Sequence, residues 1–400
     1  MPACAASSDP IVILSARRTP MGAFQGALSS VKASTLGGIA LKAAREDAGV
    51  PPERLDGVLM GCVLPAGQGQ APARQAAHGA GLPWSVPCTT LNKMCGSGMA
   101  TLMAAHDSLA AGTAQVLAAG GMESMSNAPH LLPHARGGLR MGNARLLDHM
   151  FLDGLEDAFD PGRLMGTFAE DTAQALGFSR AEQDAFARAS LERARQAQAN
   201  GDFAAEIVPV DVPGRMSTTR VEIDEAPGKA DPARIPHLKP AFREGGTVTA
   251  ANSSSISDGA AALVLTRASI AEREGWRPLA RIRAQAVHAQ EPAWFTTAPI
   301  GACQAVLDKA GWTVADVDRW EINEAFAVVT LAAMRALDLD PERVNSRGGA
   351  CALGHPIGAS GARIVVTLIH TLRALGGRRG VATLCIGGGE ATALAIELVE

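Results

Sequence analysis

Two similar glycine-rich segments stand far apart in the sequence, and each one opens an apolar helix that leads into a strand. The first segment is Cys95-Gly96-Ser97-Gly98, with a strand at Gln115 to Ala119. The second segment is Gly358-Ala359-Ser360-Gly361, with a strand at Val381 to Ile386. Both strands run into paired glycines. This recurrence predicts an internal duplication of one α/β unit, in which the turns that open the two helices converge on one site.

The rest of the amino-terminal part alternates between the same two kinds of element. Ile11 to Leu14 and Val58 to Leu64 have the composition of buried strands. Thr35 to Asp47 carries apolar residues at helical spacing before a stop at Gly49 and Pro51. Alternation of this kind predicts an α/β protein with a mostly parallel sheet covered by helices.

Residues 123–250 break this pattern. They contain scattered Pro, Gly and Arg, an amphipathic helix from Arg180 to Ala199, and a charged, proline-spaced stretch from Val212 to His237. Because such a segment is too long for a plain loop, we interpret it as an inserted loop domain over the site. The domain boundaries we expect are 1–122 with 251–273 for the amino-terminal half, 123–250 for the loop domain, and 274–400 for the carboxyl-terminal half.

The composition excludes several classes of protein. The seven cysteines are odd in number and have no paired spacing, so a secreted disulfide framework is not expected. Because no C-x-x-C pattern occurs and the nine histidines are scattered, we assign no metal. A formal charge of −4 without a basic run argues against nucleic acid or a membrane as partner. Met1 to Pro10 lacks the pattern of a signal peptide, so we expect a cytoplasmic protein.

Three residues have the chemistry needed for covalent acyl transfer. Cys95 and Cys385 each stand beside a glycine-rich turn, and His355 lies between Gly354 and Pro356. The start of a helix should lower the pKa of the Cys95 thiol, which favours a reactive thiolate with His355 as its base. For Cys95 alone, a buried inert cysteine is an equally good interpretation, because free cysteine is among the most buried residue types.

Two polar segments allow two interpretations each. Asn323 follows the strand-like Trp320 to Ile322, at a position where an amide either caps a helix or holds a water, and Glu324 would be a first-turn acid. The hydroxyl-rich run from Thr247 to Gly259 could cradle a ligand or form an ordinary turn. Taken alone, each segment favours the structural interpretation.

Together these segments closely resemble the thiolases, in the same order along nearly the whole chain. The resemblance rests on Asn92-x-x-Cys95-Gly96-Ser97-Gly98, Gly120-Gly121-Met122-Glu123-Ser124-Met125-Ser126, Asn323-Glu324-Ala325-Phe326, Gly348-Gly349-Ala350-x-Ala352-Leu353-Gly354-His355-Pro356-Ile357-Gly358-Ala359-Ser360-Gly361 and Cys385-Ile386-Gly387-Gly388-Gly389. Blocks of this length are far more specific than one short motif. The resemblance implies the thiolase fold, with two duplicated βαβαβαββ halves packed as a five-layer α-β-α-β-α core, plus the loop domain.

The resemblance also implies a ping-pong reaction with coenzyme A thioesters. Cys95 would take an acyl group while His355 accepts its proton, and Cys385 would then remove an α-proton from acetyl-CoA, so that the carbanion attacks the acyl-enzyme. Thiolysis of a 3-oxoacyl-CoA is the reverse. One oxyanion hole would come from His355 and a water on Asn323, and another from the backbone N–H groups of Cys95 and Gly387. Coenzyme A would be a substrate or product, and no tightly bound cofactor is expected.

Further positions would contact coenzyme A. Ser254 corresponds to a serine on the pantetheine, and Lys229 or Arg234 would replace a cation that is missing at Pro227.

The acyl pocket departs from many biosynthetic members of the family. Met165, Phe295 and Phe326 are assigned to the coenzyme A and acyl site. Leu164 replaces a common histidine and Phe295 a common methionine, which leaves the acyl specificity open. Glu390 replaces a small or apolar residue, and we expect it to face the surface.

The preferred function is that of an acetyl-CoA C-acetyltransferase, with a broad-chain 3-ketoacyl-CoA or 3-oxoadipyl-CoA thiolase as the alternative. A decarboxylating ketoacyl synthase is disfavoured, because it would need a histidine or asparagine in place of Cys385. A catalytically silent coenzyme A-binding protein is disfavoured by the intact Cys95, His355, Cys385 and Asn323. The resemblance to the thiolases implies a homodimer or homotetramer, which would cover the edge of each half-sheet.

Overall fold

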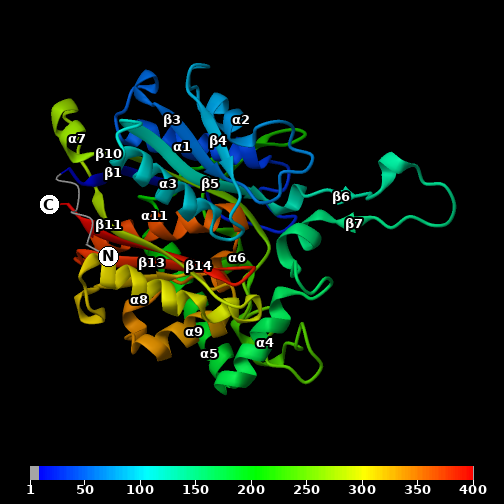
Figure 1. Cartoon of the computed structure of the whole chain (residues 1–400). Helices are drawn as coiled ribbons and strands as arrows, with labels where there is room; N and C mark the ends of the chain where they lie inside the picture. Colours follow the sequence, from blue (N-terminus) through cyan, green and yellow to red (C-terminus); the bar gives the residue numbers. More distant parts are fainter. Residues whose placement is uncertain (1–8, 400) are drawn as a thin grey trace.

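The computed structural model describes residues 9–399, which form two α/β halves and an inserted segment (Figure 1). The amino-terminal half contains β1 (Ile11–Arg18), β2 (Gly22–Ala23), α1 (Ala33–Asp47), β3 (Gly57–Gly61), α2 (Pro72–Gly79), β4 (Cys88–Leu91), α3 (Ser97–Ala110), β5 (Val116–Ser124), β10 (Ser257–Arg267) and α7 (Ala268–Glu274). The carboxyl-terminal half contains β11 (Ala280–Ala289), α8 (Ala298–Ala310), β12 (Arg319–Ile322), α9 (Ala327–Leu337), α10 (Ala350–Leu353), α11 (Ile357–Leu375), β13 (Arg379–Ile386) and β14 (Glu390–Leu398). The inserted segment contains β6 (His130–Leu131), β7 (Leu147–Asp148), α4 (Met165–Leu176), α5 (Arg180–Asn200), β8 (Val210–Pro213), β9 (Thr218–Val221) and α6 (Glu225–Lys229).

The main sheet is mixed, and the prediction of a mostly parallel sheet is wrong. Its strand order is β12-β13-β14-β11-β1-β10-β5-β3-β4. Strand β10 lies between β1 and β5 and is antiparallel to both, and β14 is likewise antiparallel to β13 and β11. Among the named strands of this sheet, β3 is parallel to both of its neighbours and β12 is parallel to β13. In each half, the last strand is therefore antiparallel to the strands on both of its sides. The apolar pattern of a single strand does not show in which direction it runs.

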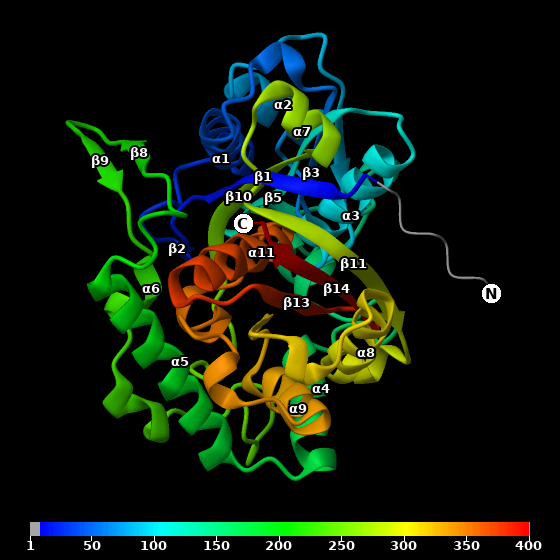
Figure 2. The same ribbon diagram turned by 90° about the vertical axis from the view of Figure 1, so that its left-hand side faces the viewer.

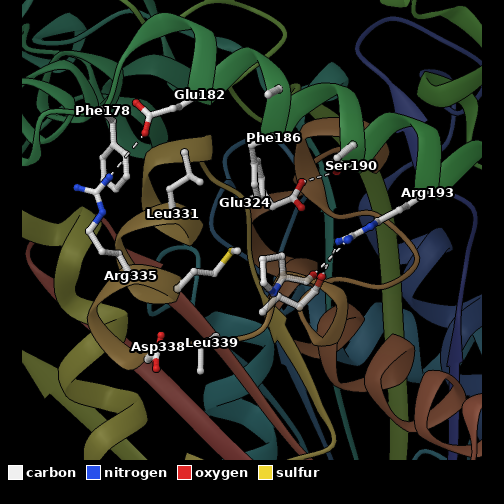
Figure 3. Close-up of a pocket in the computed structure, with 15 residues that line it drawn as sticks. Phe178, Glu182, Phe186, Ser190, Arg193, Glu324, Leu331, Arg335, Asp338 and Leu339 are labelled. Carbon is white, nitrogen blue, oxygen red and sulfur yellow. Dashed lines mark hydrogen bonds and ion pairs between the residues drawn. The ribbon is translucent and has the colours of Figure 1, made fainter.

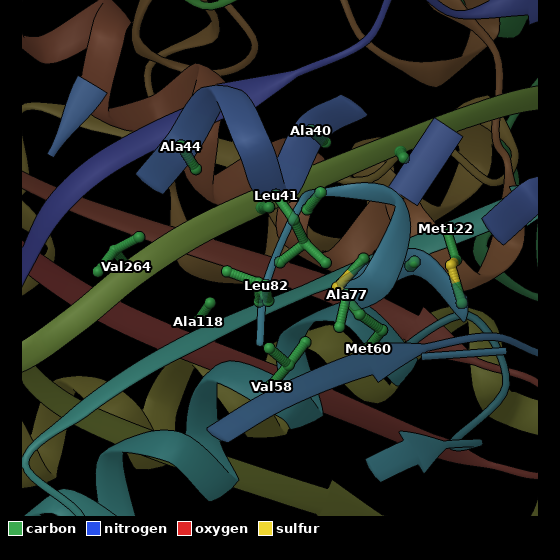
Figure 4. Close-up of a cluster of buried hydrophobic side chains, with 14 of the residues drawn as sticks. Ala40, Leu41, Ala44, Val58, Met60, Ala77, Leu82, Ala118, Met122 and Val264 are labelled. Carbon is green, nitrogen blue, oxygen red and sulfur yellow. The ribbon is translucent and has the colours of Figure 1, made fainter. Parts of the chain in front are cut away.

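The elements stack in the predicted five layers. Helices α1 and α2 cover one outer face in a shared apolar cluster (Figure 4), and α8 and α9 cover the other outer face. Helices α3 and α11 lie between the two sheet halves, with apolar side chains from both halves around them (Figure 2). The halves are joined where β1 meets β11, at Val12 with Arg281 and Ile13 with Ala280. The first turns of α3 and α11 therefore lie in the middle of the molecule.

Glycines allow the central layer to pack closely. Gly120 and Gly121 lie within β5, whereas we expected them to end that strand. A Cβ on Gly121 would lie 2.0 Å from the carbonyl oxygen of Gly358, and one on Gly98 would lie 2.8 Å from the backbone nitrogen of Ala362. No larger residue fits at these positions, so they fix the approach of β5, α3 and α11 beside the site.

The carboxyl-terminal half is an incomplete copy of the amino-terminal one. The position of its third strand holds a single parallel bridge between Trp320 and Val344. A short 3-10 turn at Pro341–Arg343 precedes Val344, and Asn345 follows with a positive φ of 47°, so the chain leaves the sheet at once. The side chain of Asn345 instead bonds to the backbone of Ile322.

In the inserted segment, α4 and α5 pack beside the carboxyl-terminal half, and the β8–β9 hairpin packs against the amino-terminal half. Helix α5 begins at the predicted place, with Ser179 and Glu182 in a reciprocal capping box. The arm formed by β6 and β7 extends far from the body in Figure 1, and the β8–β9 hairpin projects in Figure 2. Over residues 9–399, no helix combines the length and apolar character required to cross a membrane.

Candidate active site

Cys95 lies in a tight turn between β4 and α3. The N–H of Gly96 donates to the Lys93 carbonyl at 3.0 Å, and the N–H of Ser97 donates to the Met94 carbonyl at 2.9 Å. Met94 has a positive φ of 47°, a left-handed conformation that is uncommon for a residue with a long side chain. Such conformations persist where the surrounding structure enforces them, often at functional sites.

The pKa of the Cys95 thiol corrects one expectation. Burial raises this pKa, hydrogen bonds from the backbone N–H groups of Gly387 and of Cys95 itself lower it, and the charge of Glu123 raises it, with the net effect upward. The N–H groups of Gly96 and Ser97 are bonded to carbonyls within the turn and not to the sulfur. The backbone N–H groups stabilise the thiolate as expected, but burial outweighs them, so the net shift favours a protonated Cys95 thiol at rest.

We expect alkylation of Cys95 by iodoacetamide to keep accelerating past pH 9. Only the thiolate reacts, and while the pH stays below the pKa the thiolate fraction grows about tenfold per pH unit. The measurement is the labelling rate of the Cys95 peptide by mass spectrometry, with the fully buried Cys303 as an internal reference for an inaccessible thiol. A rate that levels off near neutral pH would contradict the neutral thiol.

His355 is buried, and hydrogen bonds fix its ring. Its Nδ1 lies 2.5 Å from Ser360 Oγ, and that hydroxyl donates to the Pro356 carbonyl at 2.9 Å. The hydroxyl has a single proton to give, so we assign the ring hydrogen to Nδ1 and a free lone pair to Nε2. Burial and then the charge of Arg363 lower the pKa of His355 to about 3. The neutral ring is therefore available to accept a proton at Nε2.

Asn323 does not cap a helix. Helix α9 begins at Ala327 with Phe326 in the N-cap position, so Asn323 and Glu324 both precede the first turn. The capping interpretation of Asn323 and the first-turn role of Glu324 are wrong. The Asn323 amide nitrogen lies 3.5 Å from His355 Nε2, and within residues 9–399 its buried Oδ1 has no hydrogen-bond partner. A bound water would satisfy that oxygen.

Cys385 reaches the same centre from the end of β13. Its side chain is buried, and burial followed by the proximity of Cys95 raises its pKa well above the ordinary value. The turn after β13 places the N–H of Gly387 on the sulfur of Cys95. Asn323 is tied to the same strand, because its N–H donates to the Thr383 carbonyl at 3.0 Å. The structure thus brings together both thiols and the histidine–asparagine pair.

Glu123 is a buried carboxylate to which the sequence analysis gave no role. It accepts hydrogen bonds from the backbone N–H groups of Val63 at 2.9 Å, Leu64 at 3.2 Å and Gly358 at 3.0 Å. Burial raises its pKa to about 7. This carboxylate links the end of β3 to the start of α11, close to His355. An acid in the otherwise apolar β5 was the signal that could have identified it.

Glu324 is a second buried carboxylate that joins separate segments beside the site. It accepts hydrogen bonds from Ser190 Oγ and Asn345 Nδ2, both at 2.8 Å, and from the backbone N–H of Cys351 at 3.0 Å. These bonds connect α5 to the segment that leads into His355.

The residues assigned to the acyl and coenzyme A site fall into two groups. Met165, Phe295 and Phe326 lie in the apolar cluster that contains Cys385. Phe295 packs edge-on against Phe168, with ring centroids 6.2 Å apart. The first group therefore borders the second thiol.

The second group lines a separate cavity of about 380 Å³. Lys229, Arg234 and Ser255 all contribute to its wall. Ser254 instead donates its hydroxyl to the Ala325 carbonyl at 3.0 Å. The neighbouring Ser255 faces the cavity, and a run of similar polar residues does not show in sequence which of them will do so.

A larger cavity of about 550 Å³ lies behind the site, between α5 and α9 (Figure 3). Arg335 stacks on the ring of Phe178 at its rim, with 3.7 Å from the guanidinium carbon to the ring centroid. Arg193 donates to the Val344 carbonyl at 2.9 Å, and Glu324 is bonded as described. Arg335, Arg193 and Glu324 are therefore already engaged in contacts of the fold.

Comparison with known proteins agrees with this arrangement. Residues 11–269 match the family model described as thiolase, N-terminal domain, and residues 276–398 match thiolase, C-terminal domain. This chain belongs to the thiolase family.

The similarity to known proteins extends over nine tenths or more of their length. Cytosolic acetyl-CoA acetyltransferase of Mus musculus is 48% identical over 395 residues, which cover 98% of this chain and 99% of the relative. The mitochondrial acetyl-CoA acetyltransferase of the same species is 48% identical over 392 residues, which cover 97% of this chain and 91% of the relative. The crystal structure of Acat5 thiolase from Ascaris suum in complex with coenzyme A superposes with a TM-score of 0.93 at 41% identity, and covers 98% of this chain and 100% of that one. The predicted thiolase fold is confirmed.

Proposed function

We propose that this protein is an acetyl-CoA C-acetyltransferase, which condenses acetyl-CoA with an acyl-CoA and catalyses thiolysis in the reverse direction. The observation that carries the proposal is the meeting of two thiols, with the N–H of Gly387 on the Cys95 sulfur and the His355–Asn323 pair beside them. The similarity to two acetyl-CoA acetyltransferases supports the acetyl group as substrate.

In the first half-reaction the sulfur of Cys95 attacks the thioester carbonyl of acetyl-CoA. The thiol proton moves to Nε2 of His355, and the N–H groups of Cys95 and Gly387 stabilise the oxyanion. The carbon–sulfur bond to coenzyme A then breaks, and His355 returns the proton to the leaving thiolate. Because the pKa of Cys95 is raised and that of His355 is lowered, the proton moves only as the new bond forms.

In the second half-reaction Cys385 transfers its proton to His355 and removes an α-proton from a second acetyl-CoA. The imidazolium and a water on the free Oδ1 of Asn323 stabilise the enolate oxygen. The enolate carbon attacks the acetyl group on Cys95, and the carbon–sulfur bond breaks. Cys95 recovers a proton from His355, so all three side chains return to their starting forms.

Coenzyme A would lie along the cavity that contains Lys229 and Arg234. Lys229 and Arg234 both line this cavity, whereas Pro227 is buried and carries no charge. The two cations can therefore bind the phosphates of coenzyme A in place of a cation at position 227. Lys229 is shared with Glu225 through an ion pair, which leaves Arg234 as the stronger candidate.

We propose a homodimer or homotetramer in the cytoplasm. Strand β4, which leads into the Cys95 turn, is an edge of the main sheet. The β6–β7 arm exposes Leu139, Met141 and Leu146, with exposed fractions of 57%, 99% and 66%. Apolar side chains at this exposure support burial against another subunit. Similarity favours no compartment, because one mouse relative is named cytosolic and the other mitochondrial.

The proposal is tested by thiolysis of acetoacetyl-CoA, longer 3-oxoacyl-CoA and 3-oxoadipyl-CoA with free coenzyme A, comparing kcat/KM across the series. We expect the four-carbon substrate to be preferred, since Phe295 fills space next to Cys385. We also expect a covalent adduct of about 42 Da, one acetyl group, after incubation with acetyl-CoA. Comparable values for longer or acidic chains would favour the broad-chain alternative, and no adduct with no turnover would favour a silent binder.

A further inference from the structure

An ion pair joins the two turns that meet at the site. Lys93 lies two residues before Cys95, and Glu390 is the first residue of β14. Their side chains form a salt bridge across 297 residues of sequence. The Lys93 and Glu390 side chains are 29% and 35% exposed. Glu390 is therefore only partly at the surface, and its ion pair with Lys93 was not expected from the sequence. This pair is separate from the hydrogen bonds already assigned to the chemistry.

The turn that carries Gly387 has unusual backbone freedom. Ile386 pairs with Glu390, so the three glycines between them form the whole hairpin loop. Gly388 and Gly389 have positive φ angles of 96° and 93°. Glycine has more conformational freedom to lose than any other residue, so this loop needs external contacts to hold one shape. Glu390 stands at the base of the loop, where a tether restricts it most directly.

The two turns also touch through packing. A Cβ on Gly96 would lie 2.4 Å from Cδ1 of Ile386, so only glycine allows this approach without displacement. The N–H of Gly387 bonds to the Cys95 sulfur immediately beside this contact. Packing limits how close the turns come, but apolar contact is non-directional and does not fix the sideways position of the N–H.

We propose that Lys93 and Glu390 are positioning residues that hold the backbone N–H of Gly387 on the sulfur of Cys95. The inference rests on the proposed function and adds the contact that keeps its oxyanion hole assembled. A donor of this kind is effective only within a narrow range of distance and angle, and a small displacement costs rate. A partly exposed ion pair contributes little to stability, so we expect its effect in acetylation and not in folding.

The test measures single-turnover acetylation of Cys95 from acetyl-CoA in Lys93→Met, Glu390→Gln and the charge-swapped Lys93→Glu/Glu390→Lys protein. We expect each single variant to be acetylated about tenfold more slowly, less than the loss of a whole oxyanion donor. The swap should recover to within about twofold of wild type, because it restores the pair. Arg54→Met and Glu274→Gln are matched controls, since that pair is 39% and 29% exposed and touches neither turn.

A second readout separates positioning from direct electrostatics. If the charges acted on the Cys95 thiol directly, Lys93→Met would slow its alkylation and Glu390→Gln would accelerate it. If they position the Gly387 N–H, both variants lose a bond that stabilises the thiolate, and both slow alkylation. Glu123 and Cys385, which affect this sulfur, and His355, the proposed base, are unchanged in all variants.

The outcomes are distinct. Wild-type acetylation in both single variants, a swap as slow as the slower single variant, or opposite shifts in alkylation would each overturn the inference. A raised KM for coenzyme A in Lys93→Met alone would also overturn it, because Lys93 would then act on the substrate. A wild-type protein that is not acetylated at all would instead refute the proposed function.

Discussion

Replacing Cys95 by alanine should abolish covalent acetylation and lower thiolysis of acetoacetyl-CoA by about ten-thousandfold or more, because the reaction loses its nucleophile. The turn that holds Cys95 is closed by backbone bonds of Gly96 and Ser97, so the variant should fold normally. Intact-mass measurement after exposure to acetyl-CoA and steady-state thiolysis check the two parts separately.

Cys88→Ala is the matched control for this variant. Cys88 is a partly buried thiol on the strand that precedes the Cys95 turn, and its sulfur bonds to the Val86 carbonyl at 3.4 Å, away from the site. We expect the control to acetylate and turn over like the wild type. An acetyl adduct of normal yield in Cys95→Ala would mean that another residue is the nucleophile.

Replacing Cys385 by alanine should separate the two half-reactions. Acetylation of Cys95 needs His355 but not Cys385, so the adduct should form within a few-fold of the wild-type rate. Condensation should fall by about a thousandfold, because no group remains to take the α-proton. Acetyl-enzyme should therefore accumulate, and quenched-flow mass measurement would detect it.

Cys385→Ser is the companion variant, which keeps a hydroxyl of similar size but with a much higher pKa than a thiol. We expect it to acetylate and to fail in condensation as the alanine variant does. If both Cys385 variants lost acetylation as completely as Cys95→Ala, the assignment of roles to the two thiols would be wrong.

The residues that meet at the site were predictable because each lies in a local pattern. Cys95, His355 and Cys385 stand beside glycines at the ends of helices or strands, and such ends point toward one face of an α/β layer. The antiparallel closing strands were not predictable, since β10 and β14 have apolar compositions equally suited to either direction. Local patterns identify elements but not how those elements pair.

Interactions between residues far apart in the sequence could not be predicted either. The strand before Asn323 predicts a helix start at that residue, whereas α9 begins at Ala327, whose N–H donates to the carbonyl of the distant Asn252. The raised pKa of Cys95 depends on burial by the opposite half of the chain, and the Lys93–Glu390 pair joins residues with no sequence relationship. Neither effect leaves a local signal.

The neutral state of the two thiols has a consequence for cells under oxidative stress. Peroxides attack thiolates and react slowly with protonated sulfur, so an enzyme that stored its nucleophile as a thiolate would be progressively converted to sulfenic and sulfinic acids between turnovers. Here burial raises the pKa of both Cys95 and Cys385, and the reactive form exists only while a substrate is being attacked. We therefore expect the same burial that makes His355 necessary to slow oxidation of the resting protein.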